Sequence, residues 1–526
     1  MTKTSRFSVL SISNTPIFFS QSAFRALPFV FPQIHIPSIE RVRARIHQLS
    51  GLKIAAYDCC VNSCCCFVGS YEIDDHCPFC GEPRYLGDGR TARKKYRYSP
   101  LIPRLRAMYE NQALAKDLLY RHEYKKPEPA SHNNSTGSSD SNIAFTDIWD
   151  GEIYRNLQKR HIMINGKQLQ AKYFSDSHDL ALGLTTDGFA PWRKQKYTAW
   201  PILIIVYNLP PEKRNHLKNI IPISVIPGPK KPKDIDSFLH PLVEELLKLS
   251  DGVRAFDSCT GKLFRLRAFL IMAFGDIPAM SFLMKMKGHN GVRSCRLCNI
   301  QGLRVPNVDG TAHYVPLDRT SHPDAGQPRK YDPRQLPMRT HDEFLKNAQE
   351  VVTARTRADE NRLSKLYGIK GKTILTALDS LSFPSSFPYD FMHLIYENLI
   401  KNLICLWTND FKDLNAGTGN YTIDAAVWEA IGSATSKASD TIPSVYSARL
   451  GSISGDRSTF TADNYSFWAL YIGPILLQRK FRQQCYYNHF VQLVCLLHTC
   501  LKFEYTEGDV KTIQEGFISW VLTYEK

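Results

Sequence analysis

Four stretches of closely spaced apolar residues in the middle of the chain predict β-strands. They fall at 179–188, 200–209, 220–228 and 266–276, and turn-forming Gly, Pro, Asn or Asp residues lie at or beside their ends. Between the third and fourth, residues 236–253 carry apolar side chains at helical spacing, which predicts an amphipathic helix. This succession of strands and helices predicts an α/β fold.

Polar and charged segments divide the pattern into seven parts, and the clearest boundary is a linker of Pro, Ser and Asn residues at 126–143. The expected parts are a weakly structured lead with one short helix (1–54), a cysteine module (55–86), a basic helical segment with the linker (87–143), the first part of the α/β core (144–298), a proline-rich and then helical insertion (299–380), a short helix (381–410) and a helical C-terminal region (411–526).

Composition narrows the class of partner. The chain has 526 residues, 43% of them hydrophobic, and a formal net charge of +16, which favours a polyanionic partner. Nucleic acid is the first expectation and an anionic membrane surface the second.

No apolar run reaches the roughly 18 residues that a membrane-spanning helix needs. The first 39 residues contain no Asp or Glu, which fits either an organelle transit peptide or a poorly ordered start.

Seven of the 14 cysteines fall between Cys59 and Cys80. Without a convincing secretory signal, this clustering favours a metal site over disulfides. Two short pairs separated by a short loop match a tetrahedral zinc site, and the expected ligands are Cys60, Cys64, Cys77 and Cys80. Four further residues compete for the same role: Cys59, Cys65, Cys66 and His76.

The segment FPYDFMHLIYENLIKNLICLW places Asp390, His393 and Glu397 at spacings of three, four and seven. These spacings put all three on one face of a helix whose other residues are mostly apolar. Two carboxylates and an imidazole are costly there unless a metal or hydrogen bonds satisfy them. The segment therefore indicates one wall of a metal site, and the alternative is a helix with an acidic first turn and a hydrogen-bonded histidine.

Two acids end predicted strands. Asp187 ends the first strand, where Asp-Gly is also a common hairpin turn, and Asp276 ends the fourth, fully apolar strand. Together with Glu397 they provide three carboxylates from two strand ends and one helix. Such a set suits two divalent cations about 4 Å apart for phosphoryl transfer. Hard oxygen ligands favour Mg²⁺ or Mn²⁺ over Zn²⁺.

A second cysteine pair, Cys295-x-x-Cys298, follows Asp276 closely. A lone pair of this kind is equally consistent with metal, redox or structural cysteines. Its histidine partners would be drawn from His289, His313, His322 and His393. With His393 as a partner, a second zinc ion would brace the helix that carries Glu397.

Two basic segments are candidates for DNA-backbone contacts, and the alternative for both is a solvated charged loop. The first, which would also serve nuclear import, interleaves Tyr96 and Tyr98 with basic residues, and the second is the loop PGPKKPKD. The residues concerned are Arg90, Arg93, Lys94, Lys95 and Arg97 in the first segment and Lys230, Lys231 and Lys233 in the second.

The cysteine module and the segments LGLTTDGFAPW, FGDIPAM with SCRLC, and DFMHLIYENL stand in this order along the chain. In this combination the chain resembles CACTA-type (En/Spm-like) DNA transposases, most of all the versions found in mushroom-forming fungi, from about Tyr57 onward. The resemblance implies an RNase H-like catalytic core with a large, mostly helical insertion, a zinc-ribbon-like N-terminal module and a helical C-terminal region. The family's DDE triad falls on Asp187, Asp276 and Glu397.

The resemblance also places the family's cysteine pair on Cys295 and Cys298 and its D-x-x-H element on Asp390 and His393. It implies an Mg²⁺-dependent nuclease in which water cuts a phosphodiester at the element's end and the freed 3′-hydroxyl attacks target DNA. The implied partners are double-stranded DNA, namely terminal repeats and target, and further copies of the chain on that DNA, without a membrane. The expected location is the nucleus, with the mitochondrion as the alternative that the acid-free start suggests.

Two other functions remain open from the residues. One is a zinc-dependent DNA-binding protein that descends from such an element and has no catalytic activity. The other is a structural or protein-interaction role for the cysteine module, with the acids as satisfied polar residues. The mutual placement of Asp187, Asp276 and Glu397 separates these functions from the enzyme, because only the enzyme requires the three to meet.

Overall fold

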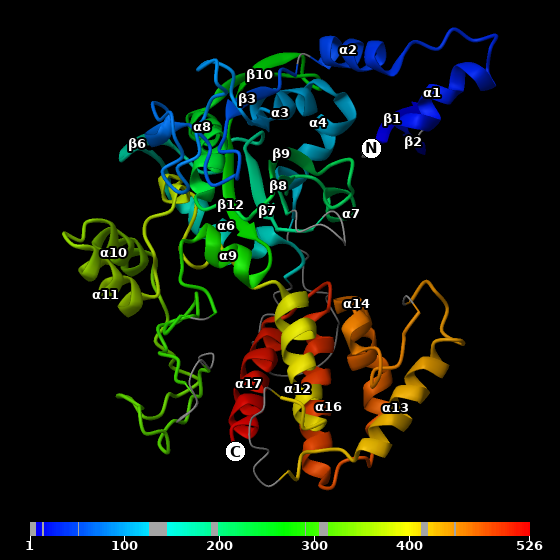
Figure 1. Ribbon diagram of the computed structural model, residues 1–526, viewed down its shortest axis with the longest axis vertical. Helices are drawn as coiled ribbons and strands as arrows, with labels where there is room; N and C mark the ends of the chain where they lie inside the picture. Colours follow the sequence, from blue (N-terminus) through cyan, green and yellow to red (C-terminus); the bar gives the residue numbers. More distant parts are fainter. Residues whose placement is uncertain are drawn as a thin grey trace, which may run out of the picture.

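The computed structural model combines a mixed sheet with many helices (Figure 1). It describes residues 7–12, 15–50, 52–125, 145–190, 198–289, 291–304, 314–411, 419–446 and 449–526. The predicted linker at 126–143 and His313 lie outside the described residues.

The sheet has six strands in the order β12-β7-β8-β9-β4-β3. β7 (Leu180–Thr186), β8 (Ala199–Val206) and β9 (Ile221–Pro227) form an antiparallel series, and β12 (Ala268–Phe274) pairs with β7 in parallel. These are the four strands predicted from the apolar runs. Because β7 and β12 are parallel neighbours, their carboxyl ends lie side by side along the edge of the sheet where these strands end.

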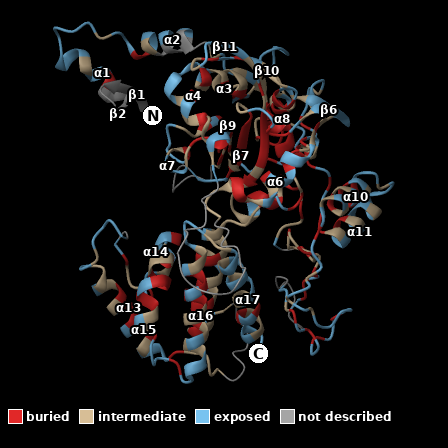
Figure 2. Cartoon of the chain, turned by 180° about the vertical axis from the view of Figure 1, so that it is seen from behind, coloured by how far each residue is buried: buried red, intermediate tan, exposed pale blue. Residues whose placement is uncertain are grey.

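Both faces of the sheet are covered. Helix α8 (Ile235–Asp251), the helix predicted between the third and fourth strands, packs on one face, where Phe238 and Leu242 meet Leu182 and Ile204. The opposite face packs against α6 (Glu152–Lys159) and the hairpin of β5 (His161–Ile164) and β6 (Lys167–Lys172). Successive residues along each strand point alternately into the hydrophobic cores on the two faces of the sheet. Because both faces are buried, the strand sequences are continuously apolar. Figure 2 shows this buried centre.

The far edge of the sheet comes from the N-terminal part of the chain. β3 (Ala55–Asp58) pairs with β4 (Lys95–Tyr98), and β4 pairs with β9 through Tyr98 and Ser224. The cysteine module is the loop between β3 and β4, so the module and the core share one sheet. The short strand β4 falls in the basic segment, where side chains alternate between exposed Lys95 and Arg97 and buried Tyr96 and Tyr98.

The helical stretch expected after β4 is divided into three helices. They are α3 (Leu101–Glu110), α4 (Gln112–Leu118) and α5 (Tyr120–Glu123). The first break falls at Asn111, whose side chain accepts hydrogen bonds from the backbone N–H groups of Ala113 and Leu114. Asparagine commonly caps a helix in this way, which explains why the second helix begins here.

The remaining elements surround this core. They are the hairpin β1 (Phe7–Ile12) and β2 (Thr15–Ser20), α1 (Gln21–Val30), α2 (Ile39–Ser50), α7 (Pro211–Arg214), the hairpin β10 (Val253–Asp257) and β11 (Lys262–Leu266), α9 (Ile277–Leu283), α10 (His341–Val352) and α11 (Arg357–Tyr367).

The C-terminal part is helical, as predicted, and has its own hydrophobic core (Figure 1). Its elements are η4 (Met392–Ile400), α12 (Lys401–Trp407), α13 (Ala425–Ala438), α14 (Ala462–Phe467), η6 (Trp468–Ile472), α15 (Gly473–Leu476), α16 (Gln484–Cys500) and α17 (Glu507–Tyr524). The prediction of an α-helix over the Asp390–Glu397 segment is wrong in one respect, because η4 is a π-helix. Such turns are rare and often occur at functional sites.

Within the described residues, no helix is both long and apolar enough to cross a membrane.

Candidate functional site: a cysteine cluster and an acidic centre at the strand ends

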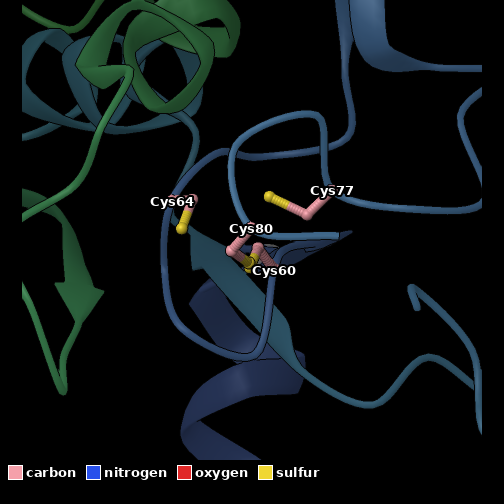
Figure 3. A group of neighbouring side chains, drawn as sticks. All are labelled: Cys60, Cys64, Cys77 and Cys80. Atoms are coloured by element: carbon pink, nitrogen blue, oxygen red, sulfur yellow. The ribbon is translucent and has the colours of Figure 1, made fainter. Parts of the chain in front are cut away.

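The predicted zinc ligands come together in the loop between β3 and β4. The sulfur atoms of Cys60, Cys64, Cys77 and Cys80 all lie within 4.8 Å of one another (Figure 3). A zinc ion with four Zn–S bonds of about 2.3 Å needs sulfurs roughly 3.8 Å apart. The Cys60 and Cys80 sulfurs, at 3.5 Å, are close to that spacing.

Local backbone geometry explains why these cysteines converge. Gly81 adopts a positive φ of 72°, and its N–H donates to the Cys77 carbonyl, so the chain turns back on itself between Cys77 and Cys80. Only glycine takes up this left-handed conformation without strain. The backbone N–H of Asn62 donates to the Cys60 sulfur at 3.4 Å, and its side-chain amide to the Cys80 sulfur at 3.6 Å.

The competing cysteines have other surroundings. Cys59 and Cys66 lie in the main hydrophobic core beneath the sheet, and His76 is exposed outside the cluster. Cys65 is the nearest rival, since its sulfur lies 3.9 Å from that of Cys77. It is fully buried, and the four sulfurs that all lie within 4.8 Å of one another do not include its own.

The donor set of the cluster fits Zn²⁺. Four sulfurs in a tight group are the usual ligands of a closed structural zinc site. Burial raises the pKa of Cys60 to about 11. For Cys80, burial is outweighed by hydrogen bonds from the Glu82 backbone and Asn62, which lower the pKa to about 7. A bound zinc ion would hold all four as thiolates.

The cysteine loop is fastened to the loop that follows β9. The Cys64 carbonyl accepts hydrogen bonds from the backbone N–H groups of Lys233 and Asp234, both at 2.9 Å. The Lys94 ammonium donates to the carbonyls of Val61 at 3.1 Å and Pro227 at 3.3 Å and also contacts the Gly228 carbonyl. Lys94 therefore holds protein carbonyls together.

The other basic residues proposed to contact DNA differ in how far they are exposed. Arg93 pairs with Glu82 at 2.6 Å and is partly buried. The more exposed basic residues of the two segments are Arg90, Lys95, Arg97, Lys230, Lys231 and Lys233.

The two acids at the strand ends are brought together. Asp187 follows β7, Asp276 follows β12, and the two strands are parallel neighbours. Between them the backbones approach closely, since a Cβ on Gly275 would lie only 2.7 Å from the Thr186 carbonyl oxygen. Asp187-Gly188 does not form a tight hairpin, because β8 begins only at Ala199. Gly188 instead packs against the Trp200 ring.

Burial and several charged groups act on Asp187 in this acidic centre. Partial burial raises the pKa of Asp187, and the neighbouring Asp276 carboxylate raises it further. The charge of Asp390 also raises the pKa of Asp187, whereas that of His393 lowers it. Asp276 is the N-cap of α9 and accepts a hydrogen bond from the Ala279 N–H at 2.5 Å.

The η4 segment aligns its three polar residues as the spacing predicted. His393 Nδ1 lies 2.6 Å from Asp390, and Nε2 lies 3.8 Å from Glu397. Burial would lower the pKa of His393, but the hydrogen bond and charge of Asp390, with Glu397 and Asp276 nearby, raise it. Asn398 fixes the π-helical turn by donating to the His393 carbonyl at 2.6 Å.

The acids approach one another less tightly than the cysteines do. Across the described ranges, the four cysteines are the one group of three or more His, Cys, Asp or Glu side chains whose ligand atoms all lie within 4.8 Å. The donor chemistry of Asp187, Asp276 and Glu397 nevertheless fits Mg²⁺, which prefers carboxylate oxygens. Mutual repulsion keeps such acids apart, and a divalent cation between them would remove that repulsion.

The second cysteine pair has a different environment from the one predicted. The Cys298 N–H donates to the Cys295 sulfur at 3.3 Å, and the Tyr389 hydroxyl lies 3.7 Å from the same sulfur. The Cys298 side chain, opposed by burial, lowers the pKa of Cys295 to about 5. In the described part of the chain, the pair and His393 do not form a compact ligand group.

The other proposed histidine partners of the pair differ in their availability. Both ring nitrogens of His322 are engaged, by the Arg304 carbonyl at 2.7 Å and the Asp324 N–H at 3.1 Å. His289 is exposed.

Sequence reasoning missed Arg296, which lies between the cysteine pair and the acids. Its side chain is 2% exposed and stacks 3.9 Å from the Tyr389 ring centre, and it donates to the Pro388 carbonyl at 2.6 Å. Burial lowers its pKa, and the charges of Asp390 and Asp276 counteract this. Its position inside SCRLC, between the two cysteines, is the signal that the sequence offers.

Comparison with known proteins adds one match. Residues 159–319 match the sequence model of the transposase family tnp2. The matched segment contains β7, β8, β9 and β12 with Asp187 and Asp276, and it ends before η4. The match supports a transposase role and implies DNA binding. No curated protein matches the chain.

Proposed function

We propose that the protein is a metal-dependent DNA transposase of the CACTA type, from the fungal branch, with an RNase H-like core. One observation carries the proposal: Asp187 and Asp276 follow the ends of two parallel strands, and His393, which lies 3.8 Å from Glu397, carries a charge that acts on Asp187. The family match over the strands supports it. So does the strand order, since three antiparallel strands stand beside a fourth that is parallel to the first.

In this proposal Asp187, Asp276 and Glu397 hold two Mg²⁺ or Mn²⁺ ions. Bound there, the ions would supply Lewis acidity and neutralise charge at the phosphodiester that is cut. Asp390 and His393 orient the helix that carries Glu397. Catalysis rests on positioning and charge rather than on a covalent intermediate with the protein.

The zinc sites have supporting roles. The Cys60-Cys64-Cys77-Cys80 cluster holds Zn²⁺ and stabilises the loop between β3 and β4. Cys295 and Cys298, with His393 as a partner, would hold a second zinc ion behind the acidic centre. Among the described residues these three side chains are not a compact group, and both ring nitrogens of His393 face carboxylates, so this ligand set would require a different orientation of the imidazole.

The partners are the element's terminal repeats and target DNA, bound by several copies of the chain in the nucleus. The net charge of +16 and the exposed Lys95, Arg97 and Lys233 support DNA binding. A second candidate, an inactive DNA-binding protein derived from such an element, is favoured by the looser spacing of the acids.

Strand cleavage decides between the two. Purified protein is incubated with Mg²⁺ and DNA that carries the element's own terminal repeats, as wild type, Glu397→Gln and the control Glu110→Gln on the exposed end of α3. We expect cleavage by wild type and Glu110→Gln and none by Glu397→Gln. Equal cleavage by all three would reject the triad, and binding without cleavage by any of them would favour the inactive protein.

A further inference from the structure

Three lysines from distant parts of the chain lie on neighbouring segments, and the charge of Asp276 acts on one of them, Lys231. Lys231 lies in the loop after β9, Lys287 follows α9, and Lys370 follows α11. The segments around Lys287 and Lys370 run side by side, since the Lys287 N–H donates to the Gly368 carbonyl at 2.9 Å and Met286 bridges Ile369. In the described part of the chain, none of these three ammonium groups has an ion-pair partner within 4 Å.

Lys231 is held by two aromatic rings. Its ammonium lies 4.2 Å from the Phe282 ring centre and 5.0 Å from that of Trp200. Phe282 belongs to α9, which Asp276 caps, and Trp200 packs against the glycine that follows Asp187. The Lys231 ammonium is therefore supported by the same elements that carry the two strand-end acids.

The three ammonium groups repel one another. The charge of Lys287 acts on Lys370, and the charge of Lys370 acts on Lys231. A fourth lysine shows the contrast, because Lys285 on the same segment is neutralised by Asp236 at 2.7 Å. The charge of Asp276 offsets part of this repulsion at Lys231, and an anion from outside the chain would offset the rest.

We propose that Lys231, Lys287 and Lys370 form a phosphate-binding site that holds the DNA backbone next to the acidic centre. The inference rests on the proposed function, since it assigns this site to the same DNA. A lysine ammonium is a compact donor suited to phosphate oxygens, and aromatic support fixes Lys231 without consuming its charge. The charge of Asp276 acts on Lys231, so the site holds a phosphate close to the one that would be cut.

Binding without catalysis tests the site separately from the nuclease. Fluorescence anisotropy with a 30-base-pair duplex in EDTA measures affinity across a salt series for Lys231→Ala, Lys287→Ala and Lys370→Ala. The control is Lys365→Ala, an exposed lysine on α11 with the same change in charge. We expect each site variant to bind about three- to tenfold more weakly at low salt and the triple variant to lower the salt slope by about 1. The control should stay within twofold of wild type.

Affinities for all three site variants that equal that of Lys365→Ala would overturn the proposal. Glu397→Gln should retain full binding in this assay, so a failure of the nuclease hypothesis leaves the lysine site testable.

Lysine acetylation provides a second measurement that needs no substitution. Wild-type protein is acetylated with and without the duplex and analysed by mass spectrometry. We expect DNA to protect Lys231, Lys287 and Lys370 but not Lys365. Protection by poly-glutamate without protection by DNA would mean that the site takes an acidic protein segment, and it would overturn the assignment to DNA.

Discussion

The Nδ1 atom of His393 lies 2.6 Å from a carboxylate oxygen of Asp390. This contact orients the imidazole so that its other nitrogen faces Glu397. Asp390 therefore acts on Glu397, the proposed third metal ligand, through the imidazole of His393. A residue that orients a ligand in this way usually changes activity by less than the ligand itself.

Asp390→Asn is expected to lower DNA cleavage about 10- to 100-fold, because the amide holds the imidazole less firmly and loses its negative charge. Glu397→Gln should lower it more. Initial cleavage rates at saturating Mg²⁺ measure both effects, and Asp463→Asn, on the exposed first turn of α14, is the control. A rate for Asp390→Asn equal to that of the control would remove Asp390 from the centre.

Gly275→Ala should disturb the acidic centre by displacing the end of β7, the strand that precedes Asp187. Its Cβ would meet the Thr186 carbonyl oxygen at 2.7 Å, and that backbone atom cannot move without shifting the end of β7. We expect a loss of about 1–3 kcal/mol in unfolding free energy, measured by urea denaturation, together with reduced cleavage. Gly326→Ala, where an added Cβ meets nothing within 4 Å, should leave both unchanged.

Cys77→Ser should remove the zinc ion of the cysteine cluster, because three thiolates and a hydroxyl bind Zn²⁺ far less tightly. Metal analysis should find one zinc ion fewer per chain, with a lower melting temperature. Cys259→Ser, outside the cluster, should keep the wild-type zinc content.

The second zinc site is tested in the same way. Cys295→Ser should remove one further zinc ion while the cysteine cluster stays loaded. Unchanged metal content in this variant would show that Cys295 and Cys298 do not bind zinc.

Lys94→Ala and Lys95→Ala should separate structure from DNA contact. Lys94 bonds protein carbonyls, so its removal leaves acceptors without a donor and should cost about 1–3 kcal/mol of stability. Lys95 is exposed, so its removal should weaken DNA binding at low salt with stability unchanged. Urea denaturation and anisotropy on both variants provide the comparison, and the reverse pattern would contradict the structure.

Asp179→Asn should change the pH dependence of stability. Asp179 is fully buried just before β7, and burial raises its pKa from 3.8 to about 6. Between these values the unfolded chain has lost the proton and the folded chain keeps it, so this group's stabilisation falls as pH rises from about 4 to 6. The asparagine variant should be more stable than wild type by about 2–3 kcal/mol at pH 7, with the difference vanishing near pH 4. Urea unfolding across this pH range measures the difference.

Much of the core could be predicted from the sequence. The runs that form β7, β8, β9 and β12 are apolar throughout because both faces of the sheet are buried, and turn residues or acids mark their ends. The spacing predicted the grouping of Cys60, Cys64, Cys77 and Cys80, but it left Cys59, Cys65, Cys66 and His76 open as alternatives. By contrast, a spacing of three and four residues is that of an α-helix, so the pattern did not predict the π-helical winding of η4.

Other features depend on contacts between distant segments. The alternation in Lys95–Tyr98 was interpreted as a basic patch with aromatic residues, and only the pairing of Tyr98 with Ser224 shows that it is a strand of the main sheet. Lys287 and Lys370 lie far apart in the sequence and carry no local motif. Their pairing depends on a bridge between Met286 and Ile369 that no periodicity reveals.

The pairing of β4 with β9 has a consequence for dissecting the molecule. A fragment cut to 159–319 would keep β9 but lose β3 and β4, and with them the pairing of Tyr98 with Ser224 and the hydrogen bond from the Ser99 N–H to the Ile223 carbonyl. An uncovered strand of this kind invites pairing between chains and aggregation. A fragment that is to keep β3 and β4 beside β9 therefore has to begin upstream of Ala55.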